Sequence, residues 1–342
     1  MNMNEKFQKA LAREPQAVPP IWFMRQAGRY HQHYQKIRAK HSFMEMCKDP
    51  VLAAEVALGP IMDFDFDVSI LFSDLLFPLE AMGMGLKYEP GPQLGWHLSA
   101  ERLKDLKRVD EALPALQFQK QAAIETRKVL PQHKSLIGFV GGPWTLFTYA
   151  VEGAHKGGLE ASKAALHLFK PFCEILLPLL KANIQLQLDG GAEVIMLFDT
   201  SAGELSPALY REIVAPPLAE LARAFPKRLG YYAKGIQAAH LRHAVFSDPS
   251  LLAGLGFDHR WEITDSLRDY KVGFVQGNFD QALLFMEPGT FVAQVERYLA
   301  EVRKLPIEAR GGWVSGLGHG VLPGTPEANV RTLVKMIREV LS

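Results

Sequence analysis

The sequence is poor in cysteine and has no excess of either charge. Cys47 and Cys173 are the two cysteines in 342 residues, and they do not form a C-x-x-C pair. This pattern argues against a disulfide framework and predicts two buried, reduced thiols in a cytoplasmic protein. Lys and Arg total 38 against 37 for Asp and Glu, a net charge of +1. Because nucleic-acid and membrane surfaces need concentrated positive charge, we expect neither partner.

Long apolar runs are also missing. No run reaches the roughly 20 apolar residues of a membrane span, and the apolar stretch Ile175–Lys181 is interrupted by Pro178. The stretch 1–16 is polar and mixed in charge, which is untypical of a secretory signal. Hydrophobic residues make up 48% and charged residues 22%. This balance predicts a globular protein with a large core.

Short apolar runs that end in glycine or polar residues recur along the chain. Such runs are typical of strands buried on both faces of a parallel sheet. The predicted strands are Ile21–Met24, Val68–Phe72, Ser135–Val140, Glu193–Phe198, Leu229–Ala233, Leu251–Phe257, Val272–Val275 and Gly312–Ser315.

Segments with helical period lie between several of these runs. Asp49–Ile61 begins Asp-Pro, Ser206–Phe225 begins Ser-Pro, and Pro326–Leu341 follows Thr325, all favourable helix starts. Alternating strands and helices predict an α/β fold, a single (β/α)8 TIM-type barrel spanning residues 1–342. The span from 77 to 134 is too long for a simple link. We interpret it as a decorated connection after the second strand, ending in a helix over Leu113–Leu130.

Polar or reactive residues follow nearly every predicted strand. The C-terminal ends of parallel barrel strands carry the active site, so these residues are its candidates. They are Arg25 and Arg29, Ser73 and Asp74, Gly142 with Tyr149, Asp199 and Thr200, Lys234, Asp258, Gln276-Gly277-Asn278, and Gly318-His319-Gly320.

Each candidate also has an ordinary structural explanation. Two arginines four residues apart often form a solvated helix face, but here they follow a buried strand and could hold one carboxylate ligand. Asp74 could cap the next helix, or it could accept N–H groups of a ligand from within apolar surroundings. His319 could be a loop histidine, or a donor pressed close to a ligand between two glycines. Tyr149 could be a core residue.

Several motifs together resemble those of the uroporphyrinogen decarboxylase family. They occur in the family's order from about residue 17 to the C-terminus, and the first is the most specific. They are Met24-Arg25-Gln26-Ala27-Gly28-Arg29-Tyr30, Ile70-Leu71-Phe72-Ser73-Asp74, Gly142-Pro143-Trp144-Thr145-Leu146 with Tyr149 and Glu152-Gly153, Gln276-Gly277-Asn278 and Gly318-His319-Gly320.

The resemblance implies a homodimeric barrel without metal or organic cofactor. It would convert the four acetates of uroporphyrinogen III to methyls, giving coproporphyrinogen III and carbon dioxide. The resemblance also implies that Asp74 accepts the pyrrole N–H groups and that Arg25 and Arg29 pair with substrate carboxylates. The remaining substrate-binding residues that it implies are Gln26, Ala27, Gly28, Phe43, Tyr149, Thr200 and His319.

The chain departs from the family pattern at a few positions. Thr200 stands where Ser is usual, which preserves the hydroxyl, and Gly316 stands where Asn is usual. The segment His31-Gln32-His33 replaces a Leu-Pro-Glu pattern. We expect these differences to alter loop shape and to leave the chemistry unchanged.

Two other functions fit parts of the pattern. A related barrel methyltransferase acting on corrinoid proteins would need zinc bound by His-x-Cys and a distant Cys, and neither cysteine lies in such a motif. A non-catalytic tetrapyrrole-binding protein would keep the arginines but would have no need of Asp74. We therefore expect no metal site and an enzyme in place of a carrier.

Overall fold

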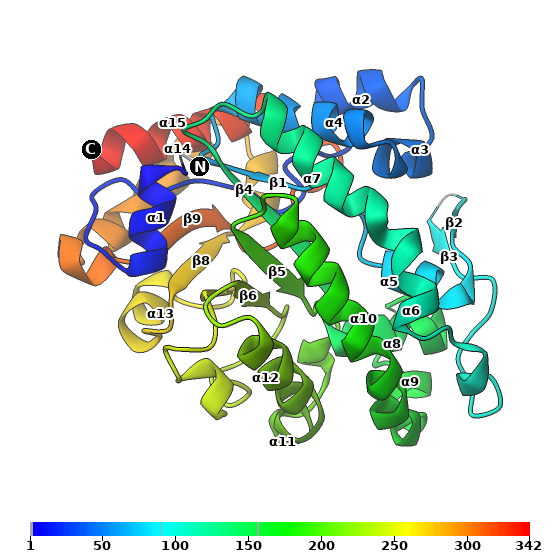
Figure 1. Ribbon diagram of the computed structural model, residues 1–342. Helices are drawn as coiled ribbons and strands as arrows, with labels where there is room; N and C mark the ends of the chain where they lie inside the picture. The colour runs from blue at the N-terminus through cyan, green and yellow to red at the C-terminus, as the bar shows by residue number, and fades with distance from the viewer. Residues whose placement is uncertain (1–2, 90, 156) are drawn as a thin grey trace.

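A curled parallel sheet forms the centre of the computed structural model, which describes residues 3–89, 91–155 and 157–342 (Figure 1). Its strand order is β1-β4-β5-β6-β7-β8-β9, so each strand pairs with the next one of this sheet along the chain. The strands are β1 Val68–Ile70, β4 Ser135–Gly141, β5 Val194–Phe198, β6 Leu229–Tyr232, β7 Gly254–Gly256, β8 Phe274–Phe279 and β9 Trp313–Leu317. Each overlaps a predicted strand, as expected for doubly buried apolar runs.

The remaining barrel position is filled by a segment around Ile21. Ile21 forms one parallel bridge to Ser315 of β9, and Ser315 N donates to Pro20 O at 2.9 Å. On its other side, Asp67 N donates to Ile21 O at 2.9 Å, and the Asp67 carboxylate accepts Ile21 N at 2.9 Å. This segment joins β9 to β1 and completes the (β/α)8-type barrel.

The predicted strand Ile21–Met24 is therefore wrong in extent. Gln26 Oε1 accepts Phe23 N at 3.1 Å, and Gln26 N donates to Phe23 O at 3.0 Å. These bonds draw the chain into a turn directly after the bridge. The apolar run is buried as predicted. The N–H and C=O of Phe23, however, bond to Gln26 within the turn and not to a neighbouring strand.

Other strand ends also differ from the prediction: β1 and β7 are shorter than predicted, and β8 and β9 run further. β8 continues to Phe279 and includes Gln276, Gly277 and Asn278, which were expected to follow it. β9 likewise continues to Leu317. Their polar and glycine residues suggested an end, yet the backbone ladder continues because it pairs Gly277 with Ser315 and Phe279 with Leu317.

Helices cover the outside of the sheet (Figure 1). The α-helices are α1 Glu5–Ala12, α2 Gln32–Arg38, α3 Phe43–Lys48, α4 Pro50–Phe64, α5 Phe77–Leu79, α6 Val109–Ala112, α7 Gln117–Val129, α8 Pro143–Glu152, α9 Glu160–Ala164, α10 Phe169–Asp189, α11 Pro207–Leu209, α12 Ala215–Ala224, α13 Ile263–Asp269, α14 Pro288–Arg303 and α15 Glu327–Leu341. Asp49 caps α4 by accepting Val51 N and Leu52 N, as its Asp-Pro start predicted.

Two predicted helices differ in detail. The predicted helix Ser206–Phe225 is divided into α11, a π-helical turn over Tyr210–Val214, and α12, because Pro216 and Pro217 lack the N–H groups of a regular α-helix. Thr325 does not cap α15, since its hydroxyl donates to Leu322 O at 2.8 Å. In α10, the helix continues through Pro178.

Within the described ranges, no helix is both long and apolar enough to span a bilayer.

The connection from β1 to β4 is decorated, as predicted. It contains α5, a π-helical turn over Glu80–Met84, the antiparallel pair β2 Lys87–Tyr88 and β3 Pro92–Gln93, α6 and α7. The helix predicted over Leu113–Leu130 begins as a 3-10 turn and becomes α-helical at Gln117. This connection reaches back to the C-terminal end of β1, where it contributes a tyrosine described below.

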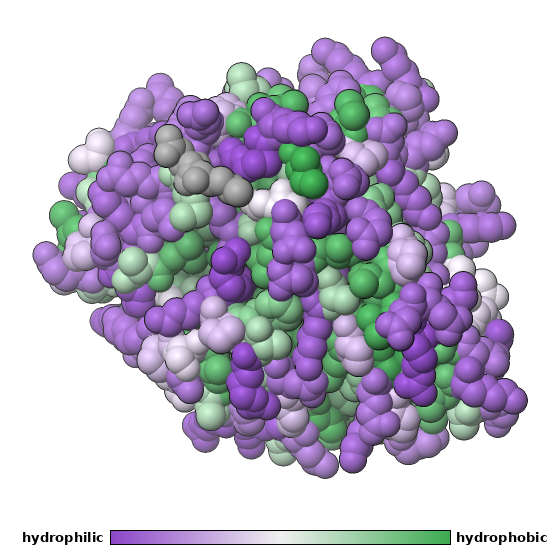
Figure 2. All heavy atoms as spheres, in the orientation of Figure 1, coloured by the Kyte–Doolittle hydropathy of each residue, from purple (hydrophilic) through white to green (hydrophobic). Residues whose placement is uncertain are grey.

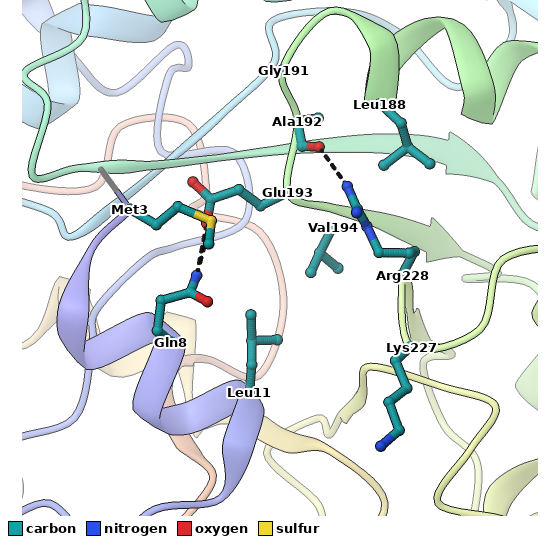
Figure 3. A pocket seen from close by; sticks show the side chains of 10 residues that line it. All are labelled: Met3, Gln8, Leu11, Leu188, Gly191, Ala192, Glu193, Val194, Lys227 and Arg228. Carbon is teal, nitrogen blue, oxygen red and sulfur yellow. Dashed lines mark hydrogen bonds between the residues drawn. The ribbon is translucent and has the colours of Figure 1, made fainter. Parts of the chain in front are cut away.

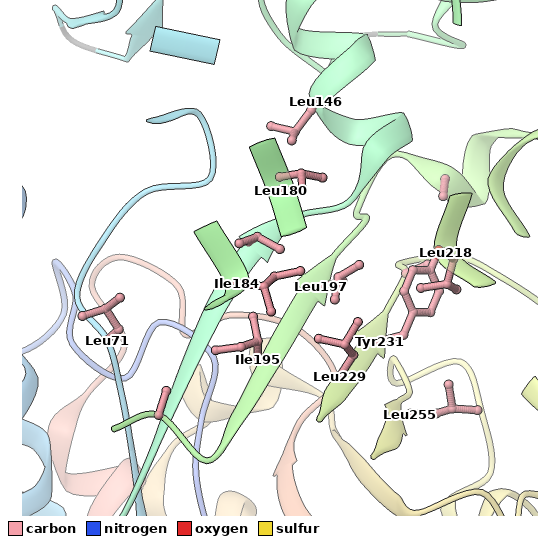
Figure 4. Packing of buried hydrophobic residues seen from close by; sticks show 14 of the residues in the cluster. Leu71, Leu146, Leu180, Ile184, Ile195, Leu197, Leu218, Leu229, Tyr231 and Leu255 are labelled. Carbon is pink, nitrogen blue, oxygen red and sulfur yellow. The ribbon is translucent and has the colours of Figure 1, made fainter. Parts of the chain in front are cut away.

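Alternate residues of the strands supply two separate cores. Val194, Met196 and Phe198 of β5 belong to the cluster inside the barrel, together with Phe7 of α1. Ile195 and Leu197 belong to the outer cluster, and Figure 4 shows them beside Ile184 and Leu180 of α10. Each fully buried aliphatic side chain contributes roughly 1.5–3 kcal/mol to the stability of the fold. The two cores therefore hold the strands, and the residues that follow them, in fixed positions. Polar side chains dominate the outer face seen in Figure 2.

Candidate active site

The predicted site residues follow the strands at the C-terminal end of the barrel. Arg25 follows the Ile21 bridge, Asp74 follows β1, Thr200 follows β5 and His319 follows β9. Because all strands of this sheet are parallel, these segments leave the barrel at the same end.

Asp74 is the half-buried acid of this end. Its Oδ1 accepts Leu76 N at 2.9 Å within the turn before α5. Burial raises the pKa of Asp74, while the Tyr88 hydroxyl, the Leu76 N–H and the charge of Arg25 counteract that rise. The alternative role as a cap is thus partly present: one oxygen supports the turn. The Tyr88 hydroxyl lies beside the same carboxylate.

Tyr88 of β2 reaches Asp74 from the decorated connection. Its buried hydroxyl lies beside the Asp74 carboxylate, and burial together with the charge of Asp74 raises the pKa of Tyr88. Phe43 packs on the Tyr88 ring at 4.6 Å and on Phe72 at 5.9 Å. Phe43 therefore lies at the same corner as Asp74, whereas Tyr88 was not among the predicted site residues.

Arg25 lies at the centre of the candidate site. Its φ of 60° is left-handed, which costs a non-glycine residue about 1 kcal/mol or more. Its side chain runs across Gly320, where an added Cβ would lie 2.5 Å from Arg25 Cδ. Its charge lowers the pKa values of Asp74, Tyr149 and His319. Arg25 is therefore the residue whose charge acts on three of the other candidates.

The rest of the arginine motif has different surroundings. Arg29 is exposed, as Arg25 is, but its charge acts on Tyr34, and no described contact joins its side chain to Asp74. Gln26 is 1% exposed and donates to Val68 O at 3.1 Å, so it braces the turn on β1. Ala27 packs against the core. An added Cβ on Gly28 would lie 2.9 Å from Arg25 O, so glycine permits this tight turn.

His319 is held by Tyr232 of β6. The Tyr232 hydroxyl donates to Gly318 O at 2.7 Å and lies 3.2 Å from His319 Nδ1. A phenol has one proton, so the second contact requires Nδ1–H of His319 to donate. Burial, followed by the charges of Arg25 and Lys234, lowers the pKa of His319 to about 4. Near neutral pH its Nε2 is therefore an acceptor, and a donor role requires proton uptake when an anion binds.

Asp199, which directly follows β5, ties neighbouring elements together. Its Oδ1 accepts Thr145 N at 2.7 Å in the first turn of α8. Thr145 Oγ1 in turn accepts Ser201 N at 3.0 Å. These bonds hold Thr200 in place and orient α8, which carries the half-buried Tyr149. The sequence pointed to Asp199 only by its position after a strand, and Thr200 was chosen in its place.

We expect Asp199 to lower the stability of the wild-type protein as its carboxyl ionises. Burial raises its pKa from 3.8 to about 6. A raised acid pKa disfavours folding above it, by up to about 3 kcal/mol here, and the cost accumulates between about pH 4 and pH 6. Asp199→Asn keeps an acceptor oxygen for Thr145 N but does not titrate. Urea unfolding across this pH range should therefore show wild-type stability falling relative to that of the variant. Parallel pH profiles would contradict the assignment.

A hollow of about 300 Å³ lies at the opposite end of the barrel. Figure 3 shows Gln8 and Leu11 of α1 beside residues that precede β5 and β6. Gln8 donates to the Glu193 carboxylate at 3.2 Å, and Arg228 donates to Ala192 O at 3.2 Å. The first bond attaches α1 across the N-terminal end, and the second joins the segments that precede β5 and β6; barrel residues at this end serve stability. None of the predicted site residues lines this hollow.

Known proteins resemble this chain over nearly its whole length. Residues 2–340 match the family described as uroporphyrinogen decarboxylase (URO-D). A uroporphyrinogen decarboxylase from Anaeromyxobacter dehalogenans is 34% identical over 355 residues, with 98% of each chain covered. One from Thermus thermophilus is 32% identical over 354 residues, covering 99% of this chain and 98% of its own.

A solved structure shares the fold at lower identity. The methyltransferase from Methanosarcina mazei has a TM-score of 0.76 and 20% identity, and 98% of each chain is covered. This likeness supports the barrel fold alone, since the identity is low. The family match and the curated relatives carry the assignment: the chain belongs to the uroporphyrinogen decarboxylase family.

Proposed function

We propose that this protein removes the carboxyl groups of the four acetates of uroporphyrinogen III, giving coproporphyrinogen III and carbon dioxide in porphyrin biosynthesis. The observation that carries the proposal is the setting of Asp74. Its Oδ1 accepts Leu76 N, and the carboxylate lies within electrostatic reach of Arg25, Tyr88 and Tyr149. In a chain of this family, such a carboxylate suits a ligand with N–H groups at its centre and carboxylates at its rim.

The pyrrole ring of the substrate supplies the electron sink for the reaction. Protonation of a ring carbon gives a cationic, iminium-like ring. The C–C bond to the carboxylate then breaks, its electron pair neutralises the ring, and carbon dioxide leaves. A proton added to the exocyclic carbon forms the methyl group, and loss of the first proton restores the pyrrole. One proton is consumed for each carbon dioxide, and the ring itself performs the role that an organic cofactor has elsewhere.

Asp74 stabilises the cationic ring in this scheme. A fixed charge in a water-poor site acts strongly on charge that develops there. The role requires ionised Asp74, and the Tyr88 hydroxyl, the Leu76 N–H and the charge of Arg25 counteract part of the rise that burial causes in its pKa. Arg25 also pairs with a substrate carboxylate through its guanidinium fork. We assign Arg29 a weaker carboxylate contact at the exposed edge.

The other predicted residues complete the binding surface. Phe43 and Tyr88 pack against one face of the substrate, and Tyr149 and Thr200 offer hydroxyls to ring substituents. His319 contacts a carboxylate after proton uptake, or accepts an N–H while neutral. Gln26, Ala27 and Gly28 shape the turn that presents Arg25. In this proposal residues 1–342 form one catalytic domain, a homodimer in the cytoplasm without nucleic-acid or membrane partners.

Two observations bear on the methyltransferase alternative. Cys47 and Cys173 are both buried, and burial raises the pKa values of both thiols, which disfavours metal-binding thiolates. Across residues 3–89, 91–155 and 157–342, no cluster of three or more His, Cys, Asp and Glu side chains is arranged to hold a metal ion. Neither observation favours a zinc-dependent reaction. A non-catalytic carrier, for its part, would need no charge on Asp74, since an uncharged acceptor could also take the bond from Leu76 N.

Anaerobic incubation with uroporphyrinogen III tests the proposal directly. After oxidation of the products, chromatography should show species with successively fewer carboxyl groups, ending at coproporphyrin. A zinc chelator should leave the rate unchanged. Recovery of intact uroporphyrin with tight binding would favour a carrier, and loss of activity with the chelator would favour a metal-dependent reaction.

A further inference from the structure

Lys234 and Arg260 lie across the C-terminal end of the barrel from the arginine motif. Counting from the Ile21 segment through β1, β4, β5, β6 and β7, the ends of β6 and β7 face those of the Ile21 segment and β1. Lys234 follows β6 at the position opposite Arg25, and the turn containing Arg260 follows β7 opposite Asp74. The roles assigned above use neither residue.

A buried carboxylate fixes Arg260 in this position. Asp258 is 1% exposed, and its Oδ2 accepts Gly235 N at 2.6 Å and Arg260 Nη1 at 3.0 Å. Asp258 Oδ1 accepts Arg260 N at 2.9 Å. An added Cβ on Gly235 would lie 3.2 Å from Arg260 Nη1, so the guanidinium rests beside the residue that follows Lys234. The Arg260 side chain is still 53% exposed, which leaves most of its five N–H donors for another partner.

The same turn packs against the His319 loop. An added Cβ on Gly318 would lie 2.4 Å from His259 N, while Arg25 crosses the neighbouring Gly320. The His319 loop therefore lies between the Arg25 side chain and the turn that carries Arg260. The charges of both Arg25 and Lys234 lower the pKa of His319. Asp258 balances one of these positive charges, which leaves an excess suited to an anionic ligand.

We propose that Lys234 and Arg260 form a second carboxylate-binding arm, which holds the edge of the tetrapyrrole opposite to the edge held by Arg25. The inference rests on the proposed function, because it takes a ring with carboxylates on every side as the ligand. Cations on one side could hold such a ring but could not fix its tilt over Asp74. Two opposed arms set that tilt and keep the reacting acetate in place through repeated turnovers.

Charge-removing substitutions with matched controls test the second arm. Lys234→Gln and Arg260→Gln should each raise KM for uroporphyrinogen roughly tenfold, the effect of one charge-assisted contact. The salt dependence of KM should weaken in both variants. Lys227→Gln, before the same strand β6 but at the opposite end of the barrel, and Arg268→Gln, in an exposed ion pair with Asp265, should leave KM unchanged.

Binding of oxidised uroporphyrin, followed by tryptophan fluorescence, separates this inference from the proposed function. The two variants should bind uroporphyrin roughly tenfold more weakly than the wild type, whether or not the protein decarboxylates its substrate. Wild-type affinity and wild-type KM in both variants would overturn the second arm while leaving decarboxylation intact. Weakened binding in a protein that forms no coproporphyrinogen would support the arm and overturn the proposed function.

Discussion

Asp74→Asn is expected to lower kcat by roughly 10²–10³-fold, the range seen when one preorganised electrostatic group is removed from a transition state. The amide retains an oxygen for Leu76 N, which Asp74 Oδ1 accepts at 2.9 Å, so the turn before α5 should persist. It cannot supply the negative charge that the cationic pyrrole needs. Anaerobic assays with uroporphyrinogen, compared with thermal unfolding of the same variant, measure both consequences.

The stability of Asp74→Asn should equal or exceed that of the wild type. Burial raises the pKa of Asp74, so its ionised form opposes folding at neutral pH and the variant escapes that cost. The same raised pKa predicts that wild-type activity declines on acidification at a pH above the ordinary aspartate value of about 3.8. Asp74→Asn should not show that acid limb in its residual activity.

Asp49→Asn provides the matched control. Asp49 also accepts backbone N–H groups, those of Val51 at 2.9 Å and Leu52 at 3.1 Å, but it is exposed on α4. Its substitution should change stability by no more than about 1 kcal/mol and leave the rate unchanged. If Asp74→Asn behaved like Asp49→Asn, Asp74 would be a structural cap and the proposed mechanism would be wrong.

Arg25→Gly is expected to lower kcat/KM by roughly 10–100-fold without loss of stability. The substitution removes a charged hydrogen-bonding group, which contributes roughly 1.5–3 kcal/mol. Glycine accepts the left-handed φ of 60° at this position without strain. A variant that unfolds at the same or a higher temperature and yet loses activity would separate the role of the guanidinium from that of the turn.

The titration of His319 provides a second measurement on the same variant. The charge of Arg25 contributes to the depressed pKa of about 4, after burial. Arg25→Gly should therefore raise the pKa of His319, observable as a shift of its imidazole proton resonance with pH. Arg29→Gly should leave that resonance unchanged, because the described charge effects of Arg29 fall on Tyr34. Equal shifts in the two variants would contradict the central position of Arg25.

Much of the candidate site was predictable because its residues follow buried strands. Asp74 and His319 could be placed at one end of the barrel, since parallel strands present their C-terminal ends together. Tyr88 could not, because the decorated connection returns to β1 through a short hairpin whose position depends on packing. Asp199 was equally hard to assign, since its hydrogen bond to Thr145 joins residues 54 positions apart.

The sequence by itself determined the alternation of strands and helices, the decorated connection and the family motifs. These features depend on local periodicity and on short runs of residues. Both can be recognised without reference to the rest of the chain. Only the tertiary structure decided that Ile21 closes the barrel by a single bridge and that the charge of Arg25, not that of Arg29, acts on Asp74. It also placed Arg260 beside Gly235. Such contacts depend on how distant segments pack, and a competing hydrogen bond, such as that from Phe23 N to Gln26, can redirect an otherwise regular strand.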